Sequence, residues 1–213
     1  MIRFLSFALA VATPAAAHQI APATPPAAAA APVQPAAPQP ATVRVVLVTS
    51  LGPVTIALEK ERAPITSANF LRYVDAKRLD GINFYRAMKL AADVGLVQGG
   101  VRDGKLLFPP IALEPTDKTG LAHVDGTISM ARGAPNSAQA DFFIIVGAMP
   151  SLDAQPGKPG DSAGFAAFGR VVEGMDIVRR ILAAPTSPTL GDGPMKGQML
   201  APAVRILTAR RAR

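Results

Sequence analysis

Short strand-like runs divided by turn residues dominate the chain from residue 42 onward. Val43 to Ser50 and Val54 to Leu58 alternate β-branched and apolar residues, and Gly52-Pro53 between them predicts a β-hairpin. Further runs of this kind, divided by loops rich in Gly, Pro and Asp, lie at 84–86, 95–98, 127–131, 142–146, 164–172 and 204–207. Because strands and helices do not alternate regularly, we expect an antiparallel barrel or sandwich rather than a doubly wound parallel sheet.

Two amphipathic helices interrupt these strands. Pro64 opens the first, where a missing backbone donor costs nothing, and Pro185 ends the second, which covers Gly174 to Ala183. Their apolar residues recur at helical spacing and form one stripe on each helix: Ala68, Phe70, Leu71 and Val74 on the first, and Met175, Val178, Ile181 and Leu182 on the second. The 172 residues from 42 to 213 are enough to bury a core without covalent links.

The sequence divides into three parts. Arg3, an uncharged apolar run from Phe4 to Val11 and Ala15-Ala16-Ala17 have the layout of a secretory signal peptide over 1–17. In residues 18–41, ten Ala and seven Pro fill 17 of 24 positions with no charge, which predicts a disordered, extended linker. Residues 42–213 form the folded domain, with a short basic C-terminal tail. We therefore expect export, to the periplasm or an equivalent compartment, and no stable membrane insertion once the signal is cleaved.

The formal net charge is +7, with 22 Lys and Arg against 15 Asp and Glu. Three of the positive charges are Arg210, Arg211 and Arg213, so much of the excess lies at the end of the chain. No basic patch with interleaved aromatic residues occurs, and a nucleic-acid partner is not expected. We expect a monomer.

The residue inventory removes most catalytic chemistries. The chain has no Cys and two His, His18 and His123, so disulfides, thiolate metal sites and cysteine nucleophiles are excluded, and a His-built metal site is disfavoured. His123 lies in a polar turn and is expected on the surface. Ser129 has no His or Asp at a spacing that indicates a triad. We expect neither a metal nor a cofactor.

Three stretches, in this order, resemble the cyclophilin family of peptidyl-prolyl isomerases. They are Phe84-Tyr85-Arg86 with Gln98-Gly99-Gly100, then 126–138 running on to Phe142-Phe143-Ile144, then Leu152-Asp153 with 165–176. The resemblance covers 43–208. It implies a mainly β fold, a closed eight-stranded antiparallel barrel capped by two helices, and cis–trans rotation about the bond before proline, without cofactor or covalent step.

The resemblance also implies roles for particular residues. Arg86 matches the catalytic arginine, and Gln98 the glutamine that holds substrate main chain and helps to position it. Phe143 matches the floor of the proline pocket. The expected substrate-binding residues are Phe84, Leu96, Ala131, Arg132, Asp141, Phe143, Leu152 and Phe165.

Four departures from the family pattern bear on rate and peptide preference. Eleven residues separate Arg86 from Gln98, about four more than usual. Gly95 replaces an aromatic pocket wall, which is then missing or supplied by the insertion. Asp141 replaces a glutamine, and Ser151 a large rim residue.

Two functions lead, and a nucleic-acid binder that uses Arg210, Arg211 and Arg213 is the weakest of three alternatives. The leading one is an exported prolyl isomerase that assists the folding of exported proteins, with proline-containing peptides and unfolded exported chains as partners. The alternative is a chaperone module that binds Pro-containing segments in the same groove with little or no isomerase activity. Arg86 and Gln98 favour the first, and the missing aromatic at Gly95 favours the second.

Overall fold

A computed structural model describes residues 41–212. The predicted signal peptide and nearly all of the predicted linker lie outside the described residues. Among those that are described, no helix is long and apolar enough to cross a membrane.

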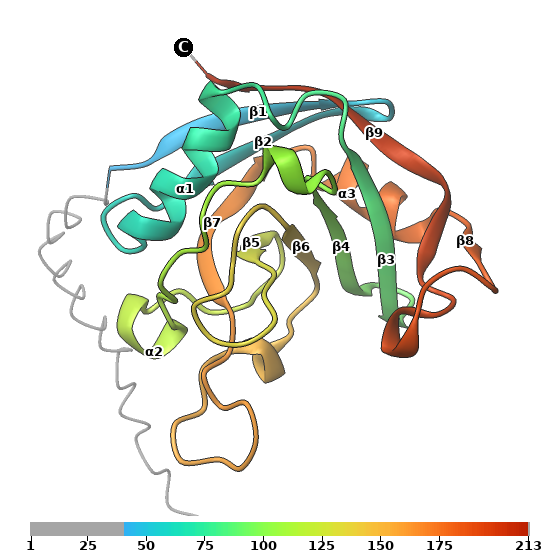
Figure 1. The fold of residues 1–213 in the computed structure, drawn as a ribbon. Coiled ribbons are helices and arrows are strands. Elements are labelled where there is room, and N and C mark those ends of the chain that lie inside the picture. The colour runs from blue at the N-terminus through green and yellow to red at the C-terminus, as the bar shows by residue number, and fades with distance from the viewer. Residues whose placement is uncertain (1–40, 213) are drawn as a thin grey trace, which may run out of the picture. The chain divides into compact units, whose positions relative to one another are not determined.

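The strands close into a barrel (Figure 1). Around it the order is β1, β2, β7, β5, β6, β4, β3 and β9, and β9 pairs with β1 to complete the circle, while the short β8 extends β9 on the outside. All pairings are antiparallel. The bounds are β1 Val43–Thr49, β2 Gly52–Leu58, β3 Asn83–Ala91, β4 Val94–Gly100, β5 Thr127–Met130, β6 Phe142–Val146, β7 Ala166–Glu173, β8 Thr186–Ser187 and β9 Met199–Arg211. The predicted closed eight-stranded antiparallel barrel is confirmed.

Both predicted helices are present. They are α1, Pro64–Asp75, which contacts β7 and β9, and α3, Met175–Ala183, which contacts β2, β3, β4 and β6. A third helix, α2, covers only Thr116–Thr119 and ends at Gly120, whose φ of +68° favours glycine. Its four polar residues carry no apolar periodicity, so the sequence did not predict it. Short 3₁₀ turns lie at Gly104–Leu106, Pro150–Leu152 and Gly193–Met195.

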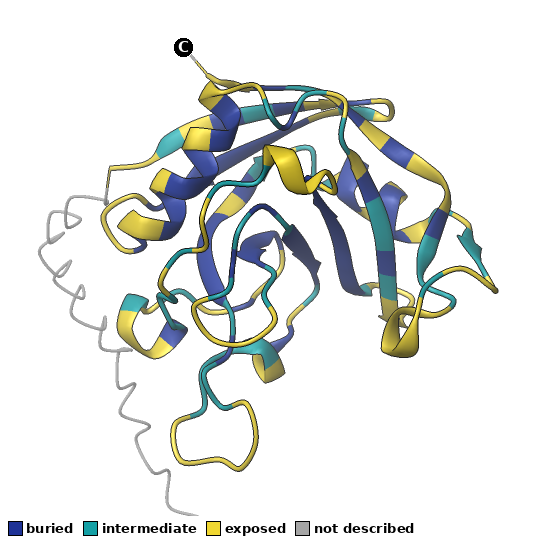
Figure 2. Cartoon of the chain, viewed as in Figure 1, coloured by how far each residue is buried: buried dark blue, intermediate teal, exposed yellow. Residues whose placement is uncertain are grey.

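The barrel has two apolar clusters, and β6 contributes to both. Its five residues are all buried, because side chains alternate between the two faces and each face is covered. Phe142 and Ile144 point into the large core that fills the barrel, where Phe142 meets Phe70 edge to face. Phe143 and Ile145 belong to a smaller cluster on the other face. In Figure 2 this strand is dark along its length, because both of its faces are covered. The smaller cluster therefore lies on the face of β6 that is turned away from the barrel core.

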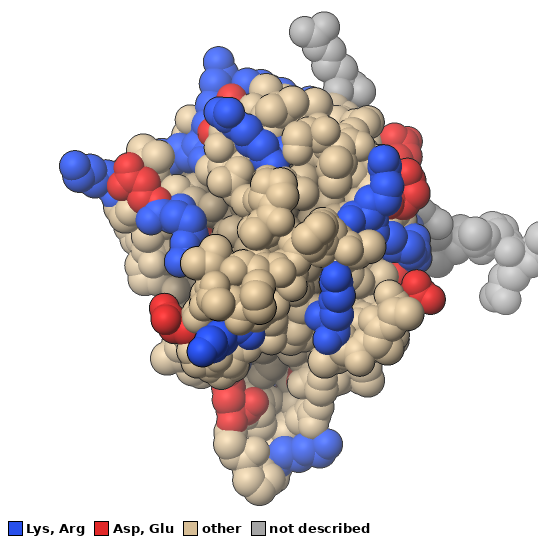
Figure 3. Space-filling model, turned by 90° about the vertical axis from the view of Figure 1, so that its right-hand side faces the viewer, with Lys and Arg blue, Asp and Glu red and all other residues tan. Residues whose placement is uncertain are grey.

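The end of the chain is a strand and not a tail, contrary to prediction. Arg210 and Arg211 lie in β9 opposite Val46 and Val45 of β1. Arg210 pairs with Asp80 at 2.7 Å and Arg211 with Asp75 at 2.6 Å. Their charges are thus compensated by the body of the domain. On the face that Figure 3 shows, basic and acidic side chains are interspersed around a mainly uncharged centre.

Candidate active site

A β-bulge in β3 brings two consecutive side chains to one place. Phe84 pairs with Gly99 and Arg86 with Gln98 of β4, so Tyr85 has no partner in the register. In a regular strand, neighbouring side chains point to opposite faces, but the extra residue of a bulge re-aims them. Both Tyr85 and Arg86 therefore reach Gln98, at 2.7 and 2.9 Å.

Two glutamines hold the Arg86 guanidinium. Its Nη1 donates to Oε1 of Gln98 and its Nε donates, at 2.8 Å, to Oε1 of Gln198, which precedes β9. Its Nη2 lies 3.6 Å from the Met88 sulfur. Burial lowers the pKa of Arg86 from its ordinary value, yet an arginine stays cationic in proteins. The group is a fixed positive charge with donors in a defined plane.

An apolar pocket adjoins this arginine. Gln98 lies opposite Phe143 of β6 in the register, so both side chains share a face. The buried members of the cluster are Leu96, Phe143, Ile145 and Met149, with Met88, Val94, Ala131, Leu152 and Phe165 packed against them. Phe165 meets Phe143 edge to face at 5.5 Å. Five of the predicted substrate-binding residues are brought together here, namely Leu96, Ala131, Phe143, Leu152 and Phe165.

The long β3–β4 hairpin contributes to that pocket. Ala91 pairs with Val94, so the additional residues lengthen both strands and do not form a loop. The hairpin supplies Met88 and Val94 to the cluster. A side chain at Gly95 would instead meet the Met88 carbonyl at 2.1 Å and Leu182 of α3 at 3.1 Å, which leaves no room for an aromatic wall there.

A polar cavity of about 360 Å³ lies beside Gln98. Asp141 and Arg102 line it, and Arg102 approaches Asp141 at 3.5 Å. Arg132 also lines it, but its side chain is only 1% exposed. It donates to the Gly164 carbonyl and pairs with Asp161 at 2.7 Å. Arg132 is therefore a fixed wall rather than a mobile cation.

Phe84 does not belong to the site. It is fully buried in the large core and meets Phe142 edge to face at 5.8 Å. The bulge at Tyr85 explains this, because it separates the inward Phe84 from the outward Arg86. Phe84 was predicted to bind substrate only because it lies two residues before Arg86 in the family motif.

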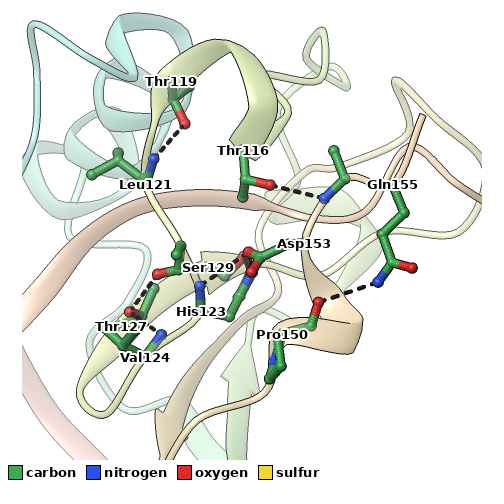
Figure 4. Close-up of polar contacts among 12 residues, drawn as sticks. Thr116, Thr119, Leu121, His123, Val124, Thr127, Ser129, Pro150, Asp153 and Gln155 are labelled. Carbon is green, nitrogen blue, oxygen red and sulfur yellow. Dashed lines mark hydrogen bonds and ion pairs between the residues drawn. The ribbon is translucent and has the colours of Figure 1, made fainter.

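His123 is buried, contrary to the predicted surface position. It is 1% exposed, and its ring joins Asp153 at 2.6 Å to Ser129 at 2.9 Å (Figure 4). Burial lowers the pKa of His123 from its ordinary value, against the opposing effect of Asp153. Ser129 has no exposed surface, so this Ser–His–Asp arrangement cannot reach a substrate and is structural. Among residues 41–212, no group of three His, Cys, Asp or Glu could hold a metal ion.

Tyr85, Gln198 and His123 were missed as site or near-site residues. Gln198 lies 112 residues after Arg86 and Asp153 lies 30 after His123, and no local pattern connects such pairs. Tyr85 lies within the Phe84-Tyr85-Arg86 motif, but only the bulge turns it toward Gln98.

Comparison with known proteins agrees with this geometry. Residues 44–210 match the family described as cyclophilin type peptidyl-prolyl cis-trans isomerase/CLD. The chain is 36% identical over 152 residues to a peptidyl-prolyl cis-trans isomerase of Acinetobacter baylyi, covering 69% of this chain and 76% of that protein. It is 34% identical over 150 residues to peptidyl-prolyl cis-trans isomerase A of Dickeya dadantii, covering 68% and 74%.

A solved cyclophilin of Cryptosporidium parvum shares the fold, with a TM-score of 0.65 and 18% identity over 81% of this chain and 99% of that one. A second structure of it, in the presence of the dipeptide Ala-Pro, gives a TM-score of 0.63 at 18% identity over 80% and 99%. The chain belongs to the cyclophilin-type peptidyl-prolyl cis-trans isomerases, enzymes that act on proline-containing peptides.

Proposed function

We propose that Arg86 is the catalytic residue of this isomerase and that its substrates are unfolded exported proteins. The barrier to rotation is about 18–20 kcal/mol because the C–N bond is partly double. Twisting breaks the resonance and returns a lone pair to the prolyl nitrogen. A cationic donor aimed at that nitrogen stabilises the twisted state more than either planar state, which is what lowers the barrier. The observation that most supports this role is that Gln98 and Gln198 hold the Arg86 guanidinium beside an apolar pocket.

The pocket fits a proline ring. Phe143 forms its floor, with Leu96 and Leu152 as walls and Phe165 at the rim. Rotation forms and breaks no covalent bond, so neither a cofactor nor a metal is needed. Residues before the proline would lie along Ala131 and the adjoining polar cavity, where Gln98 and Asp141 offer hydrogen-bond partners.

The proposal of export rests on the sequence of the first 17 residues. We expect a mature protein that begins at His18. Intact-mass measurement of the protein from periplasmic and cytoplasmic fractions of its host tests this. A cytoplasmic form that retains Met1 would contradict export without affecting the catalytic proposal.

NMR exchange spectroscopy on an X-Pro peptide tests the catalytic proposal, because it reports binding and isomerisation separately. We expect the full chain to accelerate exchange between the cis and trans resonances. If the peptide binds and exchange stays at its uncatalysed rate, the Pro-binding chaperone module becomes the better description.

A further inference from the structure

A chain of hydrogen bonds leads from the polar cavity to the catalytic arginine. The Tyr85 hydroxyl donates to Oδ2 of Asp141 at 2.6 Å. The Gln98 Nε2 donates to the Tyr85 oxygen at 2.7 Å, and Oε1 of the same amide accepts from Arg86 at 2.9 Å. Asp141 thus connects to Arg86 through two intermediate side chains.

The chemistry of the donors gives this chain a direction. An ionised carboxylate only accepts hydrogen bonds, and a tyrosine hydroxyl has a single proton to donate. Because Tyr85 donates to Asp141, its oxygen can only accept from Gln98. Gln98 therefore presents its NH₂ group to Tyr85 and its carbonyl oxygen to Arg86. With the amide reversed, two donors would face each other at Arg86.

We propose that Asp141 and Tyr85 are positioning residues for the isomerase reaction, and that they act by fixing the orientation of the Gln98 amide and through it the Arg86 guanidinium. Neither contacts the prolyl nitrogen in this scheme. The inference rests on the proposed role of Arg86.

The residues around Asp141 hold its side chain in a fixed position. Gly100 of β4 lies so close that a Cβ there would be 1.9 Å from Oδ1 of Asp141. The titratable or charged groups that face Asp141 among the described residues are Tyr85 from β3, Arg102 after β4, and Arg132 after β5, which lines the same cavity but is bound to Asp161. Burial raises the pKa of Asp141 from its ordinary value, so protonation occurs at a higher pH than for a free aspartate.

Two single variants and their combination test the proposal. Tyr85→Phe keeps the ring and removes the hydroxyl, and Asp141→Ala removes the acceptor. We expect each to lower turnover about tenfold, the order of effect of one lost hydrogen bond. Peptide affinity should be little changed by Tyr85→Phe, which removes no group proposed to contact the peptide. The double variant should be no slower than the slower single variant, because both break one chain. Effects that multiply in the double variant, or a Tyr85→Phe enzyme as fast as the wild type, overturn the proposal.

The chain supplies a matched control, since it has only two tyrosines. The Tyr73 hydroxyl accepts from the Phe108 backbone nitrogen at 2.7 Å, away from the site. Tyr73→Phe should lower the melting temperature and leave turnover per folded molecule unchanged. A loss of turnover equal to that of Tyr85→Phe would mean that any lost tyrosine hydroxyl slows the enzyme, and would reject the positioning role.

A pH profile separates positioning from a merely structural role. Wild-type turnover should fall on acidification as Asp141 gains a proton and Tyr85 is freed to donate elsewhere. Asp141→Asn keeps an acceptor without titrating, so this acid limb should disappear. In the unmodified protein, the side-chain amide resonances of Gln98 should titrate over the same pH range, which tests the idea even if a variant fails to fold. An unchanged acid limb in Asp141→Asn, or Gln98 resonances that ignore pH, would refute it.

Discussion

The imidazole ring of His123 stacks on the ring of Phe143, with centroids 6.0 Å apart and planes inclined by 18°. A buried histidine thus backs the floor of the proposed proline pocket. Asp153 and Ser129 hold that histidine at its two ring nitrogens, so its protonation state bears on both stability and site shape.

We expect the stability of this protein to decrease as the pH is lowered below neutrality. Burial lowers the folded-state pKa of His123 from its ordinary 6.5. The neutral ring therefore contributes its full stabilisation above pH 6.5, and this contribution is lost as the pH falls through the folded-state pKa. Urea unfolding at a series of pH values between 7 and 5 measures this. His123→Gln should flatten the dependence, whereas His18→Gln, in the predicted linker, should not; a flat wild-type profile would contradict the prediction.

Arg86→Ala should abolish most isomerase activity. Loss of one donor that acts on the transition state typically costs about 10²–10³ in rate. Arg86→Lys should restore little, because a point charge does not reproduce the planar fork. The free energy of unfolding should change by roughly 1 kcal/mol, since Arg86 and Gln198 are half-buried and water can take the place of the guanidinium beside the buried Gln98. Arg179→Ala, which breaks a surface pair with Asp125, is the control; equal activity of the two variants would remove Arg86 from the mechanism.

Phe143→Ala should weaken peptide binding and stability together. The side chain is 3% exposed and contacts both His123 and Phe165. Truncating a buried phenylalanine costs about 3–5 kcal/mol in stability, and the peptide also loses the pocket floor. Calorimetric titration with an X-Pro peptide and thermal melting measure the two effects. Unchanged peptide affinity in a folded variant would place the proline elsewhere.

Gly100→Ala should slow the enzyme although glycine is not needed there for backbone conformation. A Cβ at this position would lie 2.6 Å from Cα of Asp141, so the aspartate must move. Gly104→Ala is the matched control, because nothing lies within 4 Å of its Cβ. NMR exchange rates for both variants give the test. Equal rates would show that Asp141 can move without consequence.

Much of the fold was readable from local sequence. The alternating runs predicted the strands, Pro64 and the 174–183 stripe predicted two helices, and the order of three motifs predicted the barrel. Arg86, Gln98 and Phe143 were also assigned from motifs, and the structure places them in neighbouring register positions of β3, β4 and β6. The strands and helices follow from periodicity, which a sequence displays directly, whereas the closed barrel and the assignments of Arg86, Gln98 and Phe143 follow from the resemblance to the cyclophilin family.

Tertiary structure alone decided the rest. One bulged residue at Tyr85 sends Phe84 into the core and turns Tyr85 and Arg86 toward Gln98. His123 is buried because Asp153, 30 residues away, meets it, and Arg210 and Arg211 are neutralised by aspartates about 130 residues earlier. Such features depend on strand register and on contacts that form only when the barrel closes, and composition and spacing do not encode which distant groups will meet.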